Sequence, residues 1–314
     1  MPERSDALPG GPPAAPQSAP RRRRPPPSRL QRGVLAGRHG PEGLVWLGRA
    51  PEAHATILYR VVRAIVRVLL FGAFRFRIST SGQEHLPPSG GYLLVAAAHR
   101  GWMDPFVAMH ALPLEPRAWF LGSAPSTIGS RPREVLARRI GGLLPVWRGG
   151  LGIDVHVDAA RAVVAGGGVF VQMPEGTVSG PPARIGPFRL GAALIALRTG
   201  APVVPLAIAG TEELYVGRRM ASRVLPVTSA RELAGLDAGE PLPPAGSRAE
   251  LDLARRVSAR LEELLGPVVE ELHPSTVDPP SRRRLLRDRL TWLLLARGRV
   301  DRGAGGDVAP GSGG

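Results

Sequence analysis

The chain has 314 residues, 43% of them hydrophobic, which is enough for one ordinary globular domain with tails. It contains no cysteine, which excludes disulfide bonds, thiolate nucleophiles and cysteine metal sites and fits a reducing compartment. All 41 basic residues are arginine, and the formal net charge of +15 leaves an anionic membrane surface or nucleic acid as candidate partners. A coding bias toward Arg, Ala, Gly and Pro is a second explanation for part of that charge.

The two ends of the chain have the composition of disordered segments. Residues 1–50 are rich in Pro, Gly and Arg, and residues 301–314 are rich in Gly, so neither is expected to bury a core. Four consecutive arginines, residues 21–24, either contact anionic lipid or remain solvated. The first fifty residues contain no apolar segment typical of a signal peptide.

Residues 51–74 are predicted to form an amphipathic helix. Its apolar residues make a broad face, and Arg60, Arg63 and Arg67 form one stripe. Three arginines in so short a segment argue against a membrane-spanning helix. The pattern predicts a helix in the membrane interface, with arginines toward lipid phosphates; the alternative is a helix packed on the core of its own domain.

His99 follows a predicted strand, residues 92–98, and precedes a helix predicted to start at Asp104-Pro105. Ligands of open α/β sheets bind where strands end, so His99 is a candidate functional residue. A carboxylate at Asp104 can accept the Nδ1 proton of His99 and leave Nε2 to act as a base. The alternative is that Asp104 only caps the helix and His99 is only a polar turn residue.

The central part of the chain alternates short strands and helices. The predicted extended segment 143–146 is followed by Trp147 and Arg148. Arg148 either binds a phosphate in a bidentate manner or is one more surface arginine. Residues 174–177, Pro-Glu-Gly-Thr, follow another buried strand, and Glu175 is expected to bind an acceptor hydroxyl or a basic residue such as Arg148. The further predicted strands are 74–78, 117–121, 169–173, 203–208 and 223–227, and the further helices are 105–112, 132–139, 154–165, 191–199 and 249–272.

Strand 203–208 and the segment 276–300 each contain a feature that predicts more than a strand or a helix. The proline at position 205 predicts that strand 203–208 is an edge or irregular strand. Residues 276–300 include a basic amphipathic helix, 281–300, which is a candidate second membrane-surface element. The fold class predicted for residues 75–275 is α/β, a mostly parallel sheet flanked by helices and preceded by the N-terminal amphipathic helix.

Four blocks occur in a fixed order: His99-x-x-x-x-Asp104, Gly142 to Arg148, Val171 to Thr177, and Ala201 to Ile208. In this order and spacing they resemble the glycerophospholipid acyltransferase family, of the lysophosphatidic acid acyltransferase type, over about residues 76–211. The resemblance implies acyl transfer in phospholipid biosynthesis, from acyl-CoA or acyl-carrier protein to a hydroxyl of a lysophospholipid. It implies no metal and no cofactor beyond that thioester co-substrate. The expected location is peripheral, on the cytoplasmic face of the cell membrane.

The resemblance also implies roles for single residues. His99 removes the acceptor proton and Asp104 orients it, while the implied substrate-binding residues are Arg148, Glu175, Gly176, Thr177 and Arg189. Backbone N–H groups of Phe106 and Val107 are expected to stabilise the oxyanion, because Pro105 has none. Val178 stands where the family usually has arginine, which suggests another acceptor head group or a phosphate role for Arg184 or Arg189.

Two alternatives remain open at this stage. The same fold can act on another acceptor, such as glycerol 3-phosphate or an amino-lipid. The second alternative is a non-catalytic basic protein that binds an anionic membrane or nucleic acid. Because the chain has no nucleic-acid motif and few aromatic residues, no specific nucleic acid is expected as a partner. The sequence contains neither G-x-S-x-G nor G-x-x-x-x-G-K-[ST], and its seven histidines lack zinc spacing.

Overall fold

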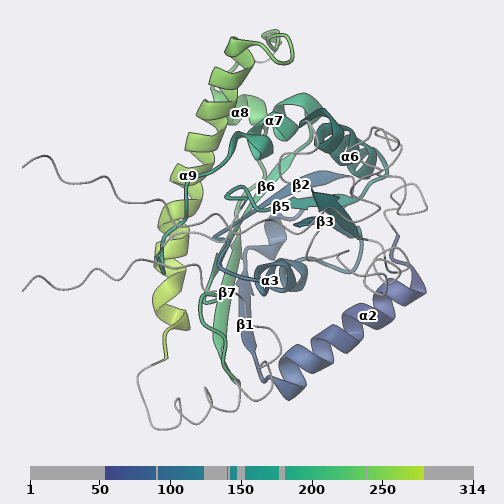
Figure 1. Cartoon of the computed structure of the whole chain (residues 1–314), viewed down its shortest axis with the longest axis vertical. Coiled ribbons are helices and arrows are strands. Elements are labelled where there is room, and N and C mark those ends of the chain that lie inside the picture. Colours follow the sequence, from purple (N-terminus) through teal and green to yellow (C-terminus); the bar gives the residue numbers. More distant parts are fainter. Residues whose placement is uncertain are drawn as a thin grey trace, which may run out of the picture.

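The computed structural model describes residues 54–89, 91–123, 140, 142–146, 153–176, 181–237 and 239–278. In this part of the chain, one sheet has the strand order β1-β7-β6-β2-β5-β3-β4 (Figure 1). Every neighbouring pair is parallel except β6 and β7, so the predicted mostly parallel sheet is confirmed. The strands are β1 (Arg77–Ser81), β2 (Tyr92–Ala97), β3 (Ala118–Ser123), β4 (Leu143–Val146), β5 (Val169–Gln172), β6 (Val203–Ala209) and β7 (Arg219–Val224).

Helices cover both faces of the sheet. Figure 1 shows α9 running along one side of the molecule past α8 and α7, with α3 over the sheet and α2 standing off at the periphery. A π-helical turn, η2, follows α2 directly, and a short 3-10 helix, η3, lies between β1 and β2. The bounds are α2 (Ile57–Val68), η2 (Leu69–Ala73), η3 (Gln83–His85), α3 (Asp104–Ala111), α6 (Ile153–Ala165), α7 (Leu190–Thr199), α8 (Ala230–Ala234) and α9 (Arg248–Thr276).

The central strand β2 is buried on both faces, and its residues divide the core in two. Leu93 and Val95 pack into the cluster formed with α6, α7, α8 and α9. Tyr92, Leu94 and Ala96 pack into the opposite cluster, which includes α3 and η2. Because successive side chains of a strand point to opposite faces, a continuous apolar run is what a strand covered by helices on both sides requires. This burial holds the carboxyl end of β2, and the residues after it, in a fixed place.

The prediction that strand 203–208 is an edge strand is wrong, because β6 lies inside the sheet between β2 and β7. The other alternative, an irregular strand, agrees with its antiparallel pairing, because the isolated bridge between Val203 and Thr228 is one residue out of register with the pair of Leu206 and Val224.

Pro205 is tolerated in β6 because of where β7 ends. The last ladder pair of the two strands is Leu206 with Val224, so Pro205 faces Leu225, just beyond β7. Leu225 donates its N–H to the Pro205 carbonyl at 2.9 Å. Of the two hydrogen bonds that this residue pair could form, only the one from the backbone nitrogen of Pro205 to Leu225 is lost, because proline has no N–H.

Other element boundaries shift for local reasons. β1 starts at Arg77 rather than at residue 74, because Phe74 closes η2 by donating its N–H to the Leu69 carbonyl. Helix α9 continues to Thr276, past the predicted end, with two prolines inside it. The short helix α8 was not predicted, although Ser229 and Glu232 form a capping box at its start, a signal that the sequence does contain.

Helix α2 has the predicted amphipathic pattern but not the predicted orientation of its arginines. Arg63 donates hydrogen bonds of 2.6–2.8 Å to the carbonyl oxygens of Met109, Leu112 and Pro113, where α3 ends. Arg60 pairs with Glu115. Carbonyls at a helix C-terminus lack intrahelical donors, so an arginine satisfies them well. The expectation that Arg60 and Arg63 face lipid phosphates is therefore corrected: both face the protein.

The opposite side of α2 is apolar and faces solvent. This apolar side consists of Ile57, Leu58, Val61, Ile65 and Val68, followed by Leu69 of η2. The exposed fraction of these residues ranges from 40% for Leu58 to 82% for Ile57. Among the described residues, no helix combines the length and the hydrophobicity that crossing a bilayer requires. The expectations for residues 1–50, 132–139, 281–300 and 301–314 lie outside the described residues.

Candidate active site

His99 and Asp104 form the predicted pair. His99 lies two residues beyond β2, and its Nδ1 is 2.6 Å from Oδ2 of Asp104. The same oxygen accepts the backbone N–H groups of Arg100, at 2.7 Å, and Gly101, at 2.8 Å. Asp104 is fully buried, while 21% of the His99 side chain is exposed. Three donors on one carboxylate oxygen fix the carboxylate, which in turn fixes the imidazole ring.

The helix-capping alternative for Asp104 is wrong. Met103 occupies the N-cap position of α3 and makes no side-chain cap, while Asp104 is the first helical residue. Its carboxylate turns back toward the β2–α3 turn instead of toward the helix. A carboxylate in this position favours the Nδ1–H tautomer of His99, so Nε2 carries the lone pair that can take a proton.

The expected oxyanion donors on α3 are already used. The N–H groups of Phe106 and Val107 both donate to the Met103 carbonyl, at 3.0 and 3.1 Å. A donor engaged within its own helix is not available to a developing oxyanion, which needs donors aimed at it. The expectation for these two residues is therefore wrong.

Glu175 joins the turn after β5 to the turn after β2. It is 2% exposed, and its Oε1 accepts the backbone N–H of His99 at 3.1 Å. β5 is the parallel neighbour of β2, so the carboxyl ends of the two strands lie side by side. Glu175 thus holds the main chain of His99. Its contact with an acceptor hydroxyl or a basic residue stays a prediction.

Arg189 lies across Gly176. Gly176 has a φ of +66°, and a Cβ atom there would fall 2.8 Å from Cδ and 3.1 Å from Nε of Arg189. The N–H of Arg189 donates to the Pro174 carbonyl at 2.8 Å, which ties the start of α7 to the same turn. Glycine therefore permits both the backbone conformation and the close approach of the arginine. The structure brings Gly176 and Arg189 together next to Glu175, with the Arg189 side chain exposed.

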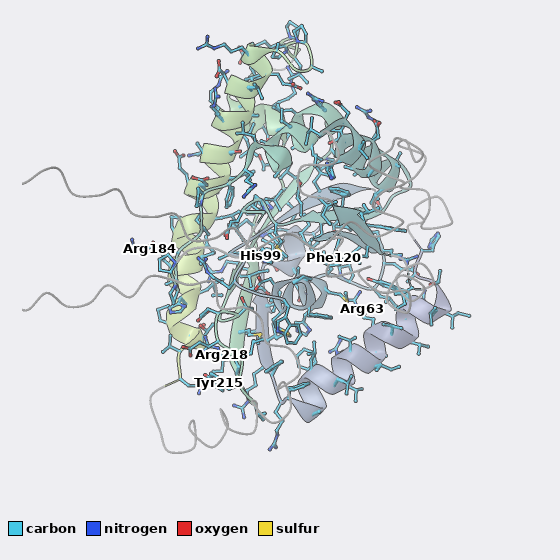
Figure 2. The ribbon with its side chains drawn as sticks, in the orientation of Figure 1. Arg63, His99, Phe120, Arg184, Tyr215 and Arg218 are labelled. Atoms are coloured by element: carbon cyan, nitrogen blue, oxygen red, sulfur yellow. The ribbon has the colours of Figure 1, made fainter. Side chains whose placement is uncertain are left out.

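Of the remaining predicted residues, the structure describes Arg184, which is not part of this assembly. Arg184 is exposed and lies 3.9 Å from Glu270 of α9, and Figure 2 shows it beside α9, to the left of His99. Arg148 and Thr177 lie outside the described residues, as does Val178.

Sequence reasoning missed Arg100, which follows His99 directly. Its side chain is buried, with 9% of the residue exposed. Burial lowers the pKa of its guanidinium, and the nearby charges of Glu175, Asp104 and Glu212, in that order, oppose this shift. The only signal in the sequence was its position in the turn between a strand and the helix that carries the carboxylate.

The described residues of this site up to Arg189 lie within a segment that matches a known protein family. The family model described as Acyltransferase matches residues 77–209, from the first residue of β1 to the last residue of β6. Residues 77–209 belong to the acyltransferase family. The matched segment is less than half of the chain, and it contains His99, Asp104 and Glu175.

One solved structure similar to this chain is that of the 1-acyl-sn-glycerophosphate acyltransferase PlsC from Thermotoga maritima. The match covers 68% of this chain and 81% of that one, with 22% sequence identity and a TM-score of 0.45. No curated protein sequence matches this chain.

The acyltransferase domain therefore presents a base held from two directions. Asp104 fixes the ring of His99 through Nδ1, and Glu175 fixes its main chain through the N–H. Such a group can remove a proton from a hydroxyl that approaches Nε2.

Proposed function

We propose that this protein transfers a fatty acyl group from acyl-CoA or acyl-carrier protein to a hydroxyl of a lysophospholipid. The observation that carries the proposal is the 2.6 Å contact between His99 and the buried Asp104, at the carboxyl end of the central strand of an acyltransferase-family domain. A general base held in this way contributes about 10²–10⁴-fold to the rate.

The reaction proceeds by direct transfer. Nε2 of His99 takes the proton of the acceptor hydroxyl as its oxygen attacks the thioester carbonyl carbon. The new C–O bond forms, the C–S bond breaks, and the imidazolium returns the proton to the leaving thiolate. Asp104 stabilises the transient positive charge on His99, because its carboxylate accepts the Nδ1–H throughout.

Two features support a lipid phosphate as acceptor. Arg189 lies beside the Glu175–Gly176 turn with its side chain exposed, and a guanidinium binds phosphate through two parallel hydrogen bonds. Trp102 is 43% exposed and packs edge-to-face on Phe106 at 5.9 Å, three residues along the chain from His99. This aromatic surface suits an acyl chain. Arg148 and Thr177 remain proposed substrate-binding residues.

The same proposal includes peripheral binding to the cytoplasmic face of the membrane. A lysophospholipid resides in a bilayer, so the enzyme must reach that surface. The exposed apolar side of α2 supports insertion into the membrane interface. Its arginines do not support it, because Arg63 donates hydrogen bonds to the protein itself. Buried hydrocarbon rather than arginine pairing would then supply most of the attraction from this helix.

The test is thiol release from an acyl thioester in the presence of a panel of acceptors. Because the protein has no cysteine, a thiol reagent detects only the released thiol. The panel contains lysophosphatidic acid, a zwitterionic lysophospholipid, glycerol 3-phosphate, an amino-lipid and no acceptor, and mass spectrometry identifies each acylated product. The proposal expects the fastest release with a lysophospholipid. Release that is equal with and without acceptor would contradict it, and a preference for glycerol 3-phosphate or the amino-lipid would replace the acceptor named here.

A further inference from the structure

Residues 185–189 lead directly into helix α7 and end with Arg189. They form neither helix nor strand, so no ladder of backbone hydrogen bonds fixes them. Arg189 occupies the N-cap position of α7 without a side-chain cap, and Pro187 has no backbone N–H to donate. The place of Arg189 therefore depends on contacts between this segment and other parts of the protein.

The long helix α9 provides one of these contacts. Oε1 of Glu262 accepts the backbone N–H of Phe188 at 2.6 Å. A hydrogen bond to a charged group is about twice as strong as one between neutral groups. The Phe188 ring also packs against two core clusters, each of which includes residues of α9. Figure 2 shows Arg184, just before this segment, beside the same helix. Helix α9 thus holds the backbone immediately before Arg189.

A second contact with α9 lies one helical turn further along. Residues 262 and 266 are four apart, so Glu262 and Gly266 lie on the same face of the helix. A Cβ atom at Gly266 would fall 3.6 Å from Cδ1 of Ile185, which shows that Ile185 lies close against the helix backbone there. One face of α9 therefore supports both ends of the stretch from Ile185 to Phe188.

The other side of Arg189 is held by the active-site turn. Its N–H donates to the Pro174 carbonyl at 2.8 Å, directly before Glu175. Glu175 in turn accepts the N–H of His99. The backbone around Arg189 is therefore fixed between α9 and the turn that holds the catalytic histidine. A contiguous set of contacts connects Glu262 with His99.

We propose that Glu262 is a positioning residue that fixes Phe188, so that the guanidinium of Arg189 is already in place to bind the acceptor phosphate. A group held in its bound position loses less freedom on binding, which raises affinity. Glu262 acts through Phe188 and Arg189 and does not contact the substrate. The effect on acceptor binding rests on the proposed function, but the attachment of the segment to α9 does not.

The decisive variants are Glu262→Ala, which removes the acceptor, and Glu262→Gln, which keeps a neutral oxygen that can accept the same N–H. Glu263→Ala is the matched control, because the Glu263 side chain on the same helix is 64% exposed and pairs with Arg260 at 2.8 Å. Ala, Gln and Glu all have good helix propensity, so α9 should remain intact in each variant.

The first readout is amide hydrogen exchange followed by NMR, which requires no enzymatic activity. The Phe188 amide should exchange about tenfold faster in Glu262→Ala, the effect of losing a hydrogen bond to a charged group. Glu262→Gln should give an intermediate rate, and Glu263→Ala should match the wild type. Unchanged exchange at Phe188 in Glu262→Ala would overturn the proposal.

The second readout is the separation of kcat from the acceptor KM. In Glu262→Ala the acceptor KM should rise about fivefold, the effect of one net hydrogen bond, with kcat nearly unchanged. Because Glu262 acts through Arg189, the double variant Glu262→Ala/Arg189→Ala should have the acceptor KM of Arg189→Ala alone. A fall in kcat without a change in KM would overturn the proposal. A lower KM in Glu262→Gln would also overturn it, because the carboxylate would then repel the phosphate directly.

Failure of the proposed function would be visible separately. If the wild type shows no acyl transfer, that function fails, while exchange at Phe188 still decides whether Glu262 holds the segment. An acceptor KM that rises in Glu262→Ala but not in Arg189→Ala would overturn the positioning role. Should Glu262→Ala fold poorly, Ile185→Ala loosens the same segment without altering the carboxylate. Phe188 exchange and acceptor KM should then both increase, and wild-type values for both would overturn the proposal.

Discussion

The turn after β2 buries charged groups, whereas helix α2 exposes hydrocarbon. Asp104 and Glu175 are almost completely inaccessible to solvent, and each accepts at least one hydrogen bond from the turn that carries His99. On α2, Ile57 is 82% exposed and Val68 is 69% exposed. Both arrangements reverse the usual distribution of polar and apolar side chains, and such reversals concentrate at functional sites.

The two regions are stabilised differently. The catalytic turn is held by short hydrogen bonds within a rigid, doubly covered sheet, so single substitutions there should have large and specific effects. Helix α2 is attached through Arg60 and Arg63, while its apolar side has no partner among the described residues. Substitutions on that side should leave the fold intact and act on what the helix contacts.

The largest effect is expected from Asp104→Asn. The neutral amide does not stabilise the imidazolium, and its NH₂ group favours the wrong tautomer when it faces Nδ1 of His99. We expect kcat to fall by about 10²–10⁴-fold, the full contribution of a general base. Steady-state acyl transfer measures this, with Asp158→Asn, on the exposed surface of α6, as the control. A variant with wild-type kcat would show that the carboxylate has no role in catalysis.

A smaller effect is expected from the apolar side of α2. Replacing Ile57, Ile65 and Val68 by serine removes three exposed hydrophobic side chains, each worth about 1.5–3 kcal/mol when fully buried. With partial insertion, binding to anionic vesicles should weaken about 10²-fold in co-sedimentation, with Ala64→Ser as the control on the same helix. Activity on a soluble short-chain acceptor should be unchanged.

Salt separates the two contributions to membrane binding. Attraction between exposed charges is screened at high ionic strength, whereas insertion of hydrocarbon is not. Part of the wild-type protein should therefore stay bound to vesicles at high salt. Complete release by salt alone would mean that α2 does not insert.

The smallest effect is expected from Arg189→Ala. Loss of a bidentate arginine–phosphate contact should raise the acceptor KM about tenfold, with kcat nearly unchanged, and lysine should restore part of the affinity. Initial rates at varied acceptor concentration test this, with Arg184→Ala as the control because Arg184 lies near Glu270 instead. An increase confined to the donor KM would move Arg189 to the thioester side.

The sequence predicted what depends on neighbours along the chain. The pair of His99 and Asp104 follows from a strand, a turn and a helix start within a few residues, so local rules were sufficient. The mostly parallel sheet follows from alternating strands and helices. The segment matched by the acyltransferase family model, residues 77–209, is nearly the same as the segment over which the sequence blocks resemble that family.

The sequence did not predict what depends on distant partners. Arg63 caps carbonyls of α3 that lie more than 40 residues away, so the stripe of arginines on α2 could not reveal which side faced the protein. Pro205 was misjudged because the end of β7, not the proline itself, decides whether the missing N–H matters. The contact of Glu175 with the His99 main chain likewise joins residues 76 positions apart.

The most direct test of the account compares thiol release by the wild type and by His99→Ala. The wild type should release one thiol for each acylated acceptor, and His99→Ala should lose about 10²–10⁴-fold of this rate with an unchanged melting temperature. His54→Ala, which alters an exposed histidine on the approach to α2, should match the wild type. A folded His99→Ala protein that acylates the acceptor at the wild-type rate would contradict the account.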